Sequence, residues 1–174
     1  MGAEQPMPKA IHASTDAPVR PVDRELYEAD EHAWIAAQIS ALTDGRLNRL
    51  DRPNLIAYLR EMTIRDRREL QSRLTVLLHH LLKVRAQRSR LTRSWVNTII
   101  EQQREIRSLV EGIPSLGRQA ETIAALAYPD AIRAASRDTG IPAVEFPEAS
   151  PWTVGEALAF DPPEPVAKGK RRRD

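Results

Sequence analysis

Apolar residues recur at helical spacing along most of the chain, and glycines and prolines separate the runs. The first run lies between Asp23, a residue type that caps helix N-termini, and Gly45, which suits the left-handed position after a helix. Its apolar face carries Tyr27, Trp34, Ala37 and Ala41. The pattern therefore predicts a first helix that begins after Asp23 and ends at Asp44-Gly45.

A second run follows Asp51, with Pro53 in the first turn, where the missing N–H of proline costs nothing. Leucines then recur in alternating steps of four and three, as in the seam of a helical bundle, at Leu70, Leu74, Leu77 and Leu81. The apolar pattern weakens over residues 65–68. Both one long helix and two helices separated near Thr63-Ile64 fit this stretch.

The last part of the chain holds further helical patterns. Apolar residues over 91–113 share one face, and a glycine and a proline close that helix. Ser115 is predicted to cap the next helix, which residues 138–142 end. Pro129 falls within that helix and predicts a kink or a fresh start, because proline removes a backbone hydrogen bond. Thr153 is predicted to cap a short final helix.

These patterns predict an all-α protein. Strand-forming aromatic and β-branched clusters are sparse, with only two Phe and three Tyr in the chain. We expect an antiparallel up-and-down bundle of four to five helices with a long central helical hairpin at residues 53–113. The proline-rich residues 1–22 are expected to form a disordered lead, residues 23–160 a single helical domain, and residues 161–174 a disordered basic tail.

Composition excludes several classes of chemistry. The chain has no cysteine, which rules out disulfides, thiolate metal sites and cysteine nucleophiles. No stretch is long and apolar enough for a membrane span, and the N-terminus lacks the apolar run of a signal peptide. We therefore expect a cytoplasmic protein that does not engage a membrane.

The net charge of +2 conceals a basic centre, because residues 60–107 carry twelve bases and five acids. No acid occurs from Gln71 to Ile100. A cluster at residues 83–93 is a candidate polyanion-binding set: Lys83, Arg85, Arg88, Arg90 and Arg93. The alternative, which we favour, is a solvated turn whose arginines pair with acids of the first helix or of residues 108–159. No aromatic residues interleave with the bases beyond Trp95, and no known nucleic-acid-binding motif occurs.

Candidate catalytic chemistry is weak. His79 and His80 are adjacent, and neighbouring helical side chains diverge by about 100°, so they do not converge on a metal. The chain has neither the helical metal motif H-E-x-x-H nor the phosphate loop G-x-x-x-x-G-K-[ST]. We therefore assign no catalytic, cofactor-binding or metal-binding residue, expect no cofactor, and interpret His80 as a hydrogen-bonded structural residue.

Several runs together resemble one family. They are L-Y-E-A-D-E-H-A-W at 26–34, R-R-E-L-Q-S-R-L-T-V-L-L-H-H-L-L-K at 67–83, R-S-W-x-x-x-I-x-E-Q at 93–102, and T-G-I-P…F-P-E-A-S-P-W-T at 139–153. In order and spacing they resemble the bacterial family called domain of unknown function 29, over residues of about 25–158. The resemblance implies a small helical protein and carries no activity. It marks His80, Trp95 and Gln102 as a candidate family polar site, whereas Val84 and Ala86 replace aromatic residues of the family.

Three functional hypotheses follow. The first is a non-enzymatic protein-interaction or self-associating module, because the leucine pairs at 77–78 and 81–82 are wider than one seam needs. It implies a protein partner or a homo-oligomer. The alternative is a nucleic-acid-binding regulator that uses the basic turn at 83–93. The third is a metal-dependent or hydrolytic enzyme around His80.

Overall fold

The computed structural model of the chain describes residues 21–165. Most of the predicted disordered lead at 1–22, and residues 166–174 of the predicted tail, lie outside the described residues. The first helix begins at Pro21, so the predicted start after Asp23 is wrong. Residues 161–165 are described and form no helix.

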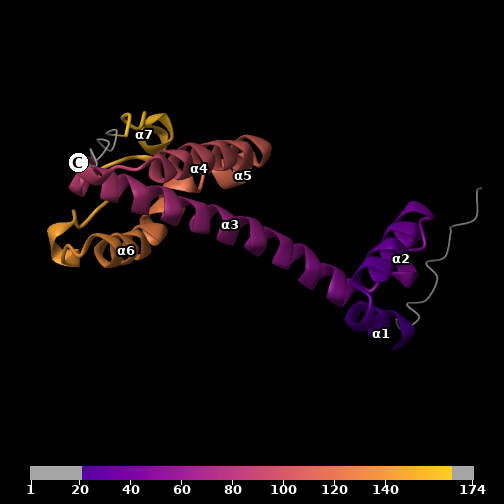
Figure 1. Cartoon of the computed structure of the whole chain (residues 1–174). Coiled ribbons are helices and arrows are strands. Elements are labelled where there is room, and N and C mark those ends of the chain that lie inside the picture. The colour runs from indigo at the N-terminus through magenta and orange to yellow at the C-terminus, as the bar shows by residue number, and fades with distance from the viewer. Residues whose placement is uncertain (1–20, 166–174) are drawn as a thin grey trace, which may run out of the picture. The chain divides into compact units, whose positions relative to one another are not determined.

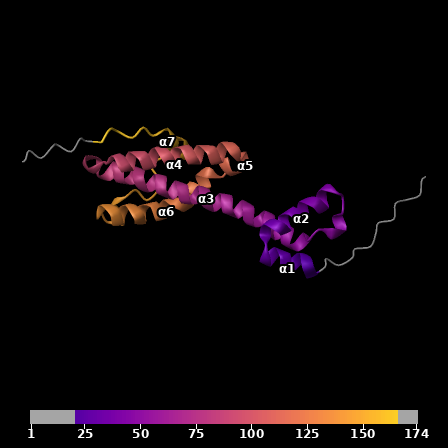
Figure 2. The ribbon, with the colours of Figure 1, turned by 45° about the vertical axis from the view of Figure 1, so that its right-hand side comes forward.

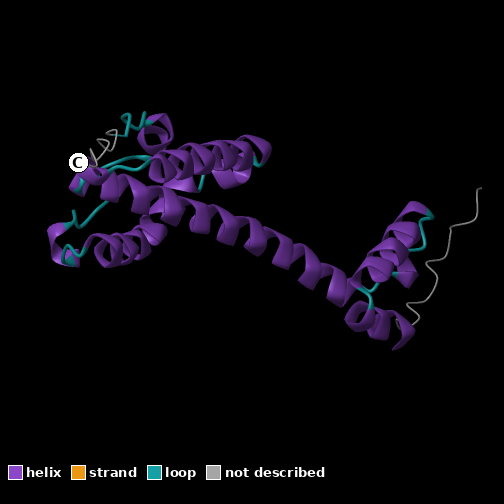
Figure 3. Ribbon diagram, viewed as in Figure 1, coloured by secondary structure: helices purple, strands orange, loops and turns teal. Residues whose placement is uncertain are grey.

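All secondary structure in the described residues is helical, which confirms the all-α fold class (Figure 3). The α-helices are α1 (Pro21–Ala29), α2 (Glu31–Thr43), α3 (Arg52–Ala86), α4 (Arg93–Gly112), α5 (Pro114–Gly117), α6 (Ala120–Thr139) and α7 (Val154–Ala159). Three short 3-10 helices connect them: η1 (Leu47–Arg49), η2 (Arg88–Arg90) and η3 (Ala143–Glu145). None of these helices is long and apolar enough to cross a membrane.

The chain divides into two compact units, residues 1–61 and residues 62–174. We call them unit 1 and unit 2, and α3 contributes residues to both. The prediction of one folding domain over residues 23–160 stays a prediction.

Unit 1 differs from the predicted single first helix. The helix breaks at Asp30, whose backbone leaves the helical region with φ −152° and ψ 88°. The Asp30 side chain instead accepts a hydrogen bond from the Ala33 amide at 3.0 Å and caps α2. At the other end of α2, Gly45 has φ 68°, which confirms the predicted left-handed position.

The core of unit 1 is built around Trp34, which is fully buried. Tyr27 and Tyr58 contact its ring edge-to-face, with centroids 4.7 and 5.7 Å away. The indole N–H donates to the buried carboxylate of Asp51 at 3.3 Å. Gln38 accepts the Asp51 amide at 2.9 Å, so the polar atoms beside the indole are paired.

Helix α3 is continuous from Arg52 to Ala86, and no break occurs near Thr63-Ile64. After Pro53 the helix contains no glycine or proline, and Leu, Arg and Glu are strong helix formers. The weak apolar pattern at 65–68 therefore reduces burial there without ending the helix.

Unit 2 contains the predicted hairpin, formed by the second half of α3 and by α4 (Figure 1). Lys83 lies over the Trp95 ring, and Arg73 reaches Glu105 at 3.5 Å. Arg73 lies ten residues before Lys83 in α3, whereas Glu105 lies ten residues after Trp95 in α4. The two helices are therefore antiparallel. Helix α6 lies along the other side of this half of α3 in both ribbon views (Figure 2).

The core of unit 2 joins leucines of α3 to branched residues of α4 and small residues of α6. Fully buried members are Leu70, Leu74, Leu77, Leu81, Leu82, Ile99, Ile106, Ile123, Ala127, Ala131 and Ala135. The alanines let α6 approach α3 closely while the leucines fill the space between helices. Both leucine rows of α3 are buried within unit 2, so they do not form a free surface.

For α6, the predicted cap at Ser115 is wrong, and so is one of the two alternatives for Pro129, the fresh helix start; the kink stays a prediction. Ser115 does not cap the helix; α5 intervenes, and Gln119 precedes α6 without a side-chain cap. Pro129 lies within a continuous helix and does not begin a new one. Ala125, which loses its hydrogen-bond donor to the proline ring, is exposed, so water can serve its carbonyl.

Helix α7 closes unit 2 across α4 and α6. Thr153 and Glu156 form a reciprocal capping box at its start, which confirms Thr153 as the cap. The buried Gln103 side chain of α4 donates to the carbonyls of Ala157 and Phe160 at 3.0 and 2.7 Å. These contacts fix the segment that follows α7 against α4.

Candidate functional site

Lys83, expected in a basic surface cluster, is buried with 6% of its surface exposed. Its ammonium donates to the Asp138 carboxylate at 2.8 Å and lies 4.2 Å from the centroid of the Trp95 ring. Because both its charge and its stem are occupied inside unit 2, Lys83 does not belong to an exposed polyanion-binding surface.

Asp138 also binds His79, whose Nε2 lies 3.0 Å from the same carboxylate oxygen. The pKa of Asp138 is lowered, chiefly by its hydrogen bond with Lys83. Burial lowers the pKa of His79 to about 4, with the charges of His80 and Lys83 acting in the same direction. At neutral pH the cluster therefore holds one ammonium, one carboxylate and a neutral imidazole.

His80 points elsewhere on α3. Its Nδ1 lies 2.9 Å from the Val76 carbonyl, one turn back, and its ring is tilted against that of His79 at 4.7 Å. Burial lowers the pKa of His80. The histidine that binds an acid is thus His79. The candidate family polar site is not brought together: Trp95 contacts Lys83, and Gln102 forms no hydrogen bond with His80 or Trp95 within the described residues.

Gln103, the neighbour of Gln102, is the buried amide of α4. It lies four residues after Ile99 and three before Ile106, so it shares their buried face. This spacing is the sequence signal that identifies Gln103 as the buried amide of the helix. Asp138 carried a weaker signal, because it lies in the segment predicted only to end a helix.

The four arginines of the basic turn are exposed: Arg85, Arg88, Arg90 and Arg93. They make no ion pair or side-chain hydrogen bond within the part of the chain that the structure describes. The expected pairing with acids of other helices is therefore absent among the described residues, and these guanidinium groups remain available to an anion.

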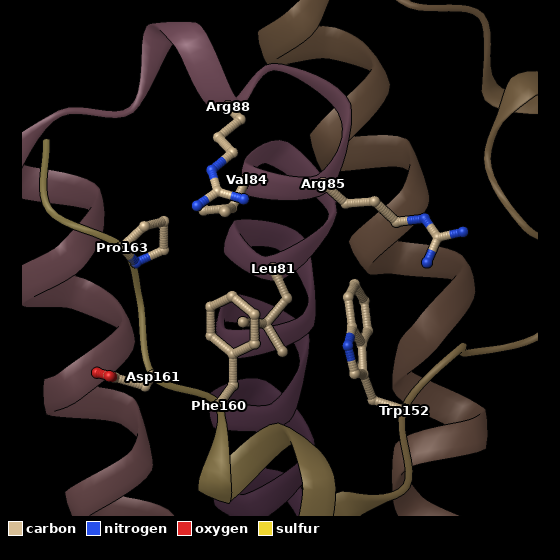
Figure 4. A pocket seen from close by; sticks show the side chains of 8 residues that line it. All are labelled: Leu81, Val84, Arg85, Arg88, Trp152, Phe160, Asp161 and Pro163. Atoms are coloured by element: carbon tan, nitrogen blue, oxygen red, sulfur yellow. The ribbon is translucent and has the colours of Figure 1, made fainter. Parts of the chain in front are cut away.

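Two of them, Arg85 and Arg88, flank a pocket of about 390 Å³, which we call the arginine pocket (Figure 4). Its floor is Leu81 and Val84 of α3, and its walls are the rings of Trp152 and Phe160. Asp161 and Pro163, from the segment after α7, complete the rim. Arg90 and Arg93 do not line it.

A second pocket of about 480 Å³ lies beside α6 and shares Trp152 with the first. Its lining includes Tyr128 and three acids, Glu121, Glu148 and Glu156. Two of these acids are already used: Glu121 accepts the Val154 amide at 2.8 Å, and Glu156 completes the capping box. We call this the glutamate pocket.

No group of three or more histidines and acids is placed to hold a metal ion within residues 21–165. The Lys83–Asp138–His79 cluster has its charges paired internally, and every buried side-chain polar atom described has a partner. In the arginine pocket, two charged side chains without ion-pair partners among the described residues lie beside an apolar lining.

A comparison with family models matches residues 26–161 to the model described as domain of unknown function DUF29. The match includes both units and ends at Asp161, on the rim of the arginine pocket. Comparisons with curated proteins and with solved structures give no match.

Proposed function

The chain belongs to the family of domain of unknown function DUF29, and we propose that it is a protein-interaction module that pairs with a second copy of itself through unit 1. The observation that carries the proposal is the exposure of large apolar side chains in that unit. The unit 1 apolar surface comprises Ile39 (58% exposed), Leu42 (50%), Leu47 (55%), Ile56 (51%) and Leu59 (54%).

The core of unit 1 is small by comparison. Among residues 25–61, the buried apolar residues are Trp34, Ala41 and Leu50, fewer than the exposed large ones. Domains of about 60 residues bury only about 60% of the surface of their unfolded chain and are marginally stable, so association adds burial that they lack. Covering the exposed side chains would supply this missing burial, at roughly 25 cal/mol for each Å² removed from water.

Charge favours a second copy as the partner. Helix α2 carries Ile35, Ile39 and Leu42 on one stripe, with Glu31 at its start and Arg49 beyond its end. The helix is about 20 Å long. In an antiparallel pair of α2 helices, Glu31 of one copy would lie toward the end of α2 of the other, after which η1 carries Arg49, and a two-fold interface forms this pairing twice.

The test is the mass of the purified chain by analytical ultracentrifugation across the micromolar range. We expect a dimer, and Leu42→Glu should weaken dimerisation at least tenfold, because it places a carboxylate in the apolar surface. The matched control is Leu126→Glu, an equally exposed leucine of unit 2, 53% exposed, which should leave dimerisation unchanged. Circular dichroism verifies that both variants remain helical.

Charge reversal tests the pairing of Glu31 with Arg49 of the second copy. Glu31→Arg and Arg49→Glu should each weaken the dimer, and the double variant should recover it, because the pairing is restored with reversed signs. A wild-type chain that is monomeric at hundreds of micromolar would contradict the proposal, as would equal weakening by Leu126→Glu. Loss of dimer without recovery in the double variant would contradict the antiparallel arrangement.

A second candidate function rests on the exposed, unpaired arginines of the basic turn. We propose as the alternative that they bind nucleic-acid phosphates, with affinity that falls steeply as salt rises. Reversing Arg85, Arg88 and Arg90 to glutamate together should abolish binding of labelled RNA and DNA. Binding that is insensitive to salt, or to these substitutions, would contradict this alternative.

A further inference from the structure

We propose that the arginine pocket of unit 2 is a binding site for a small aromatic anion, a flat ring system that carries a phosphate or carboxylate. This site is separate from the unit 1 apolar surface, so it goes beyond the proposed self-association. Three properties of the pocket support the proposal: unused positive charge, aromatic walls and size.

The charge comes from Arg85 and Arg88, which lie three residues apart around the end of α3. Both border the pocket, and neither makes an ion pair with the described residues. Guanidinium groups bind phosphate and carboxylate through parallel N–H donors, and Arg is preferred where such groups are held bidentately. In Figure 4 the Arg88 guanidinium extends toward Phe160 and Pro163, whereas that of Arg85 lies on the far side of Trp152, so Arg88 would contact the anion and Arg85 would add to the positive field at the rim.

The walls are suited to a flat apolar body. Trp152 and Phe160 both extend toward α3 in Figure 4, and Leu81 and Val84 form the apolar surface beneath them. Aromatic faces stack with ring ligands and with one another at centroid distances of about 4.5–7 Å. A ligand with a ring at one end and an anion at the other would satisfy both halves of the lining.

Size and position favour a small molecule over a polymer. The volume of about 390 Å³ lies within the range of about 300–1,000 Å³ typical of small-ligand sites. The segment after α7 closes one side through Asp161 and Pro163, and hydrogen bonds from Gln103 to the Ala157 and Phe160 carbonyls hold this segment in place. The pocket is therefore formed by ordered contacts of the chain itself.

The experiment is isothermal titration calorimetry of the full chain with 1-naphthyl phosphate. Inorganic phosphate and neutral 1-naphthol, the two halves of the probe, are titrated in parallel. We expect one-to-one binding of 1-naphthyl phosphate, with each half at least tenfold weaker. Arg85→Glu and Arg88→Glu should each weaken binding about tenfold or more, since each replaces an attractive charge with a repulsive one.

Arg90→Glu is the matched control, because it makes the same charge change in the same turn at a residue that does not line the pocket. It should alter binding of 1-naphthyl phosphate less than twofold. Asp161→Asn should strengthen binding several-fold, because it removes the one acid on the rim.

Four results would overturn the proposal. They are no binding at millimolar probe, equal binding of inorganic phosphate, equal binding of neutral 1-naphthol, and equal weakening by Arg90→Glu. Equal weakening by Arg90→Glu would show that the overall positive charge of the basic turn attracts the probe, as the nucleic-acid alternative requires. Repeating the titration with Leu42→Glu separates the two proposals, because pocket binding should persist in a monomer.

Discussion

The ammonium of Lys83 donates to the carboxylate of Asp138 at 2.8 Å, which joins the last turn of α3 to the last turn of α6 across 55 positions of sequence. The lysine side chain is 8% exposed and the aspartate side chain 36%. The pair is thus half inside unit 2, where its attraction is screened less than at an open surface.

Removing the ammonium should destabilise unit 2. Lys83→Met keeps most of the apolar stem but leaves Asp138 with His79 alone, and we expect the free energy of unfolding to fall by about 2 kcal/mol. The figure is below that of a fully buried pair because water reaches Asp138. Urea denaturation measures the loss.

Two further variants test whether the ion pair causes that loss of stability. Lys83→Met with Asp138→Asn should recover part of it, since no uncompensated carboxylate remains. Arg85→Met, at an exposed residue of the same helix, should change stability by less than about 0.5 kcal/mol. A loss as large for Arg85→Met as for Lys83→Met would show that the ion pair is not the cause.

The free energy of unfolding should decrease as the pH is lowered over a defined range. His79 titrates near 6.5 in the unfolded chain and near 4 in the folded one, so between these values the unfolded chain binds more protons. We expect unfolding free energy to decrease by about 1–3 kcal/mol from pH 7 to pH 4. The lowered pKa of Asp138 extends the loss to lower pH.

Urea midpoints at several pH values measure this dependence. His79→Gln should flatten it and not abolish it, because the pKa of His80 is also lowered. If His79→Gln leaves the dependence of stability on pH unchanged, the His79 imidazole is not kept neutral by folding.

Asp51 should govern the stability of unit 1. Its carboxylate accepts the Trp34 indole N–H, and the Asn54 amide at the start of α3. Asp51→Ala leaves the buried indole N–H without this acceptor and removes a helix cap, so we expect a loss of about 1–2 kcal/mol. Hydrogen exchange should accelerate at the amides of α2.

Asp51→Asn is the matched control, because the amide keeps one acceptor oxygen and should produce a smaller loss. The amides of residues 70–84, in unit 2, should be unaffected by either variant. Equal acceleration in both stretches would contradict an effect confined to unit 1.

Gly140 should resist replacement for a purely backbone reason. Its φ is 75°, and a Cβ added there meets no atom within 4 Å. Gly140→Ala should therefore cost about 1 kcal/mol through backbone strain alone, whereas Gly140→Asn should cost less, since asparagine tolerates this conformation. Thermal unfolding of the two variants compares them; an equal or larger loss for asparagine would contradict this explanation.

Local signals made much of the fold predictable. The glycine after α2 and the cap at Thr153 act through neighbouring backbone groups, which the sequence lists side by side. Leucine spacing predicted the seam of α3 because burial repeats with the helical turn. The break at Asp30 was missed because its capping role interrupts an apolar pattern that continues on both sides.

The candidate site was less predictable, because its partners are distant in sequence. An acid-free stretch around Lys83 suggests an exposed cation, and nothing nearby in sequence points to Asp138. The two meet only because α6 runs alongside α3 and ends beside it. Likewise, the arginine pocket needs a wall from residues 160–163, which follow α7 and carry no motif.

Trp152 lines both the arginine pocket and the glutamate pocket. A single indole therefore contributes to a pocket that holds two arginines and to one that holds three glutamates. Because the two linings share this indole, any change in its position alters the shape of both pockets. For the same reason, Trp152→Ala would change both pockets at once and would report on neither of them alone.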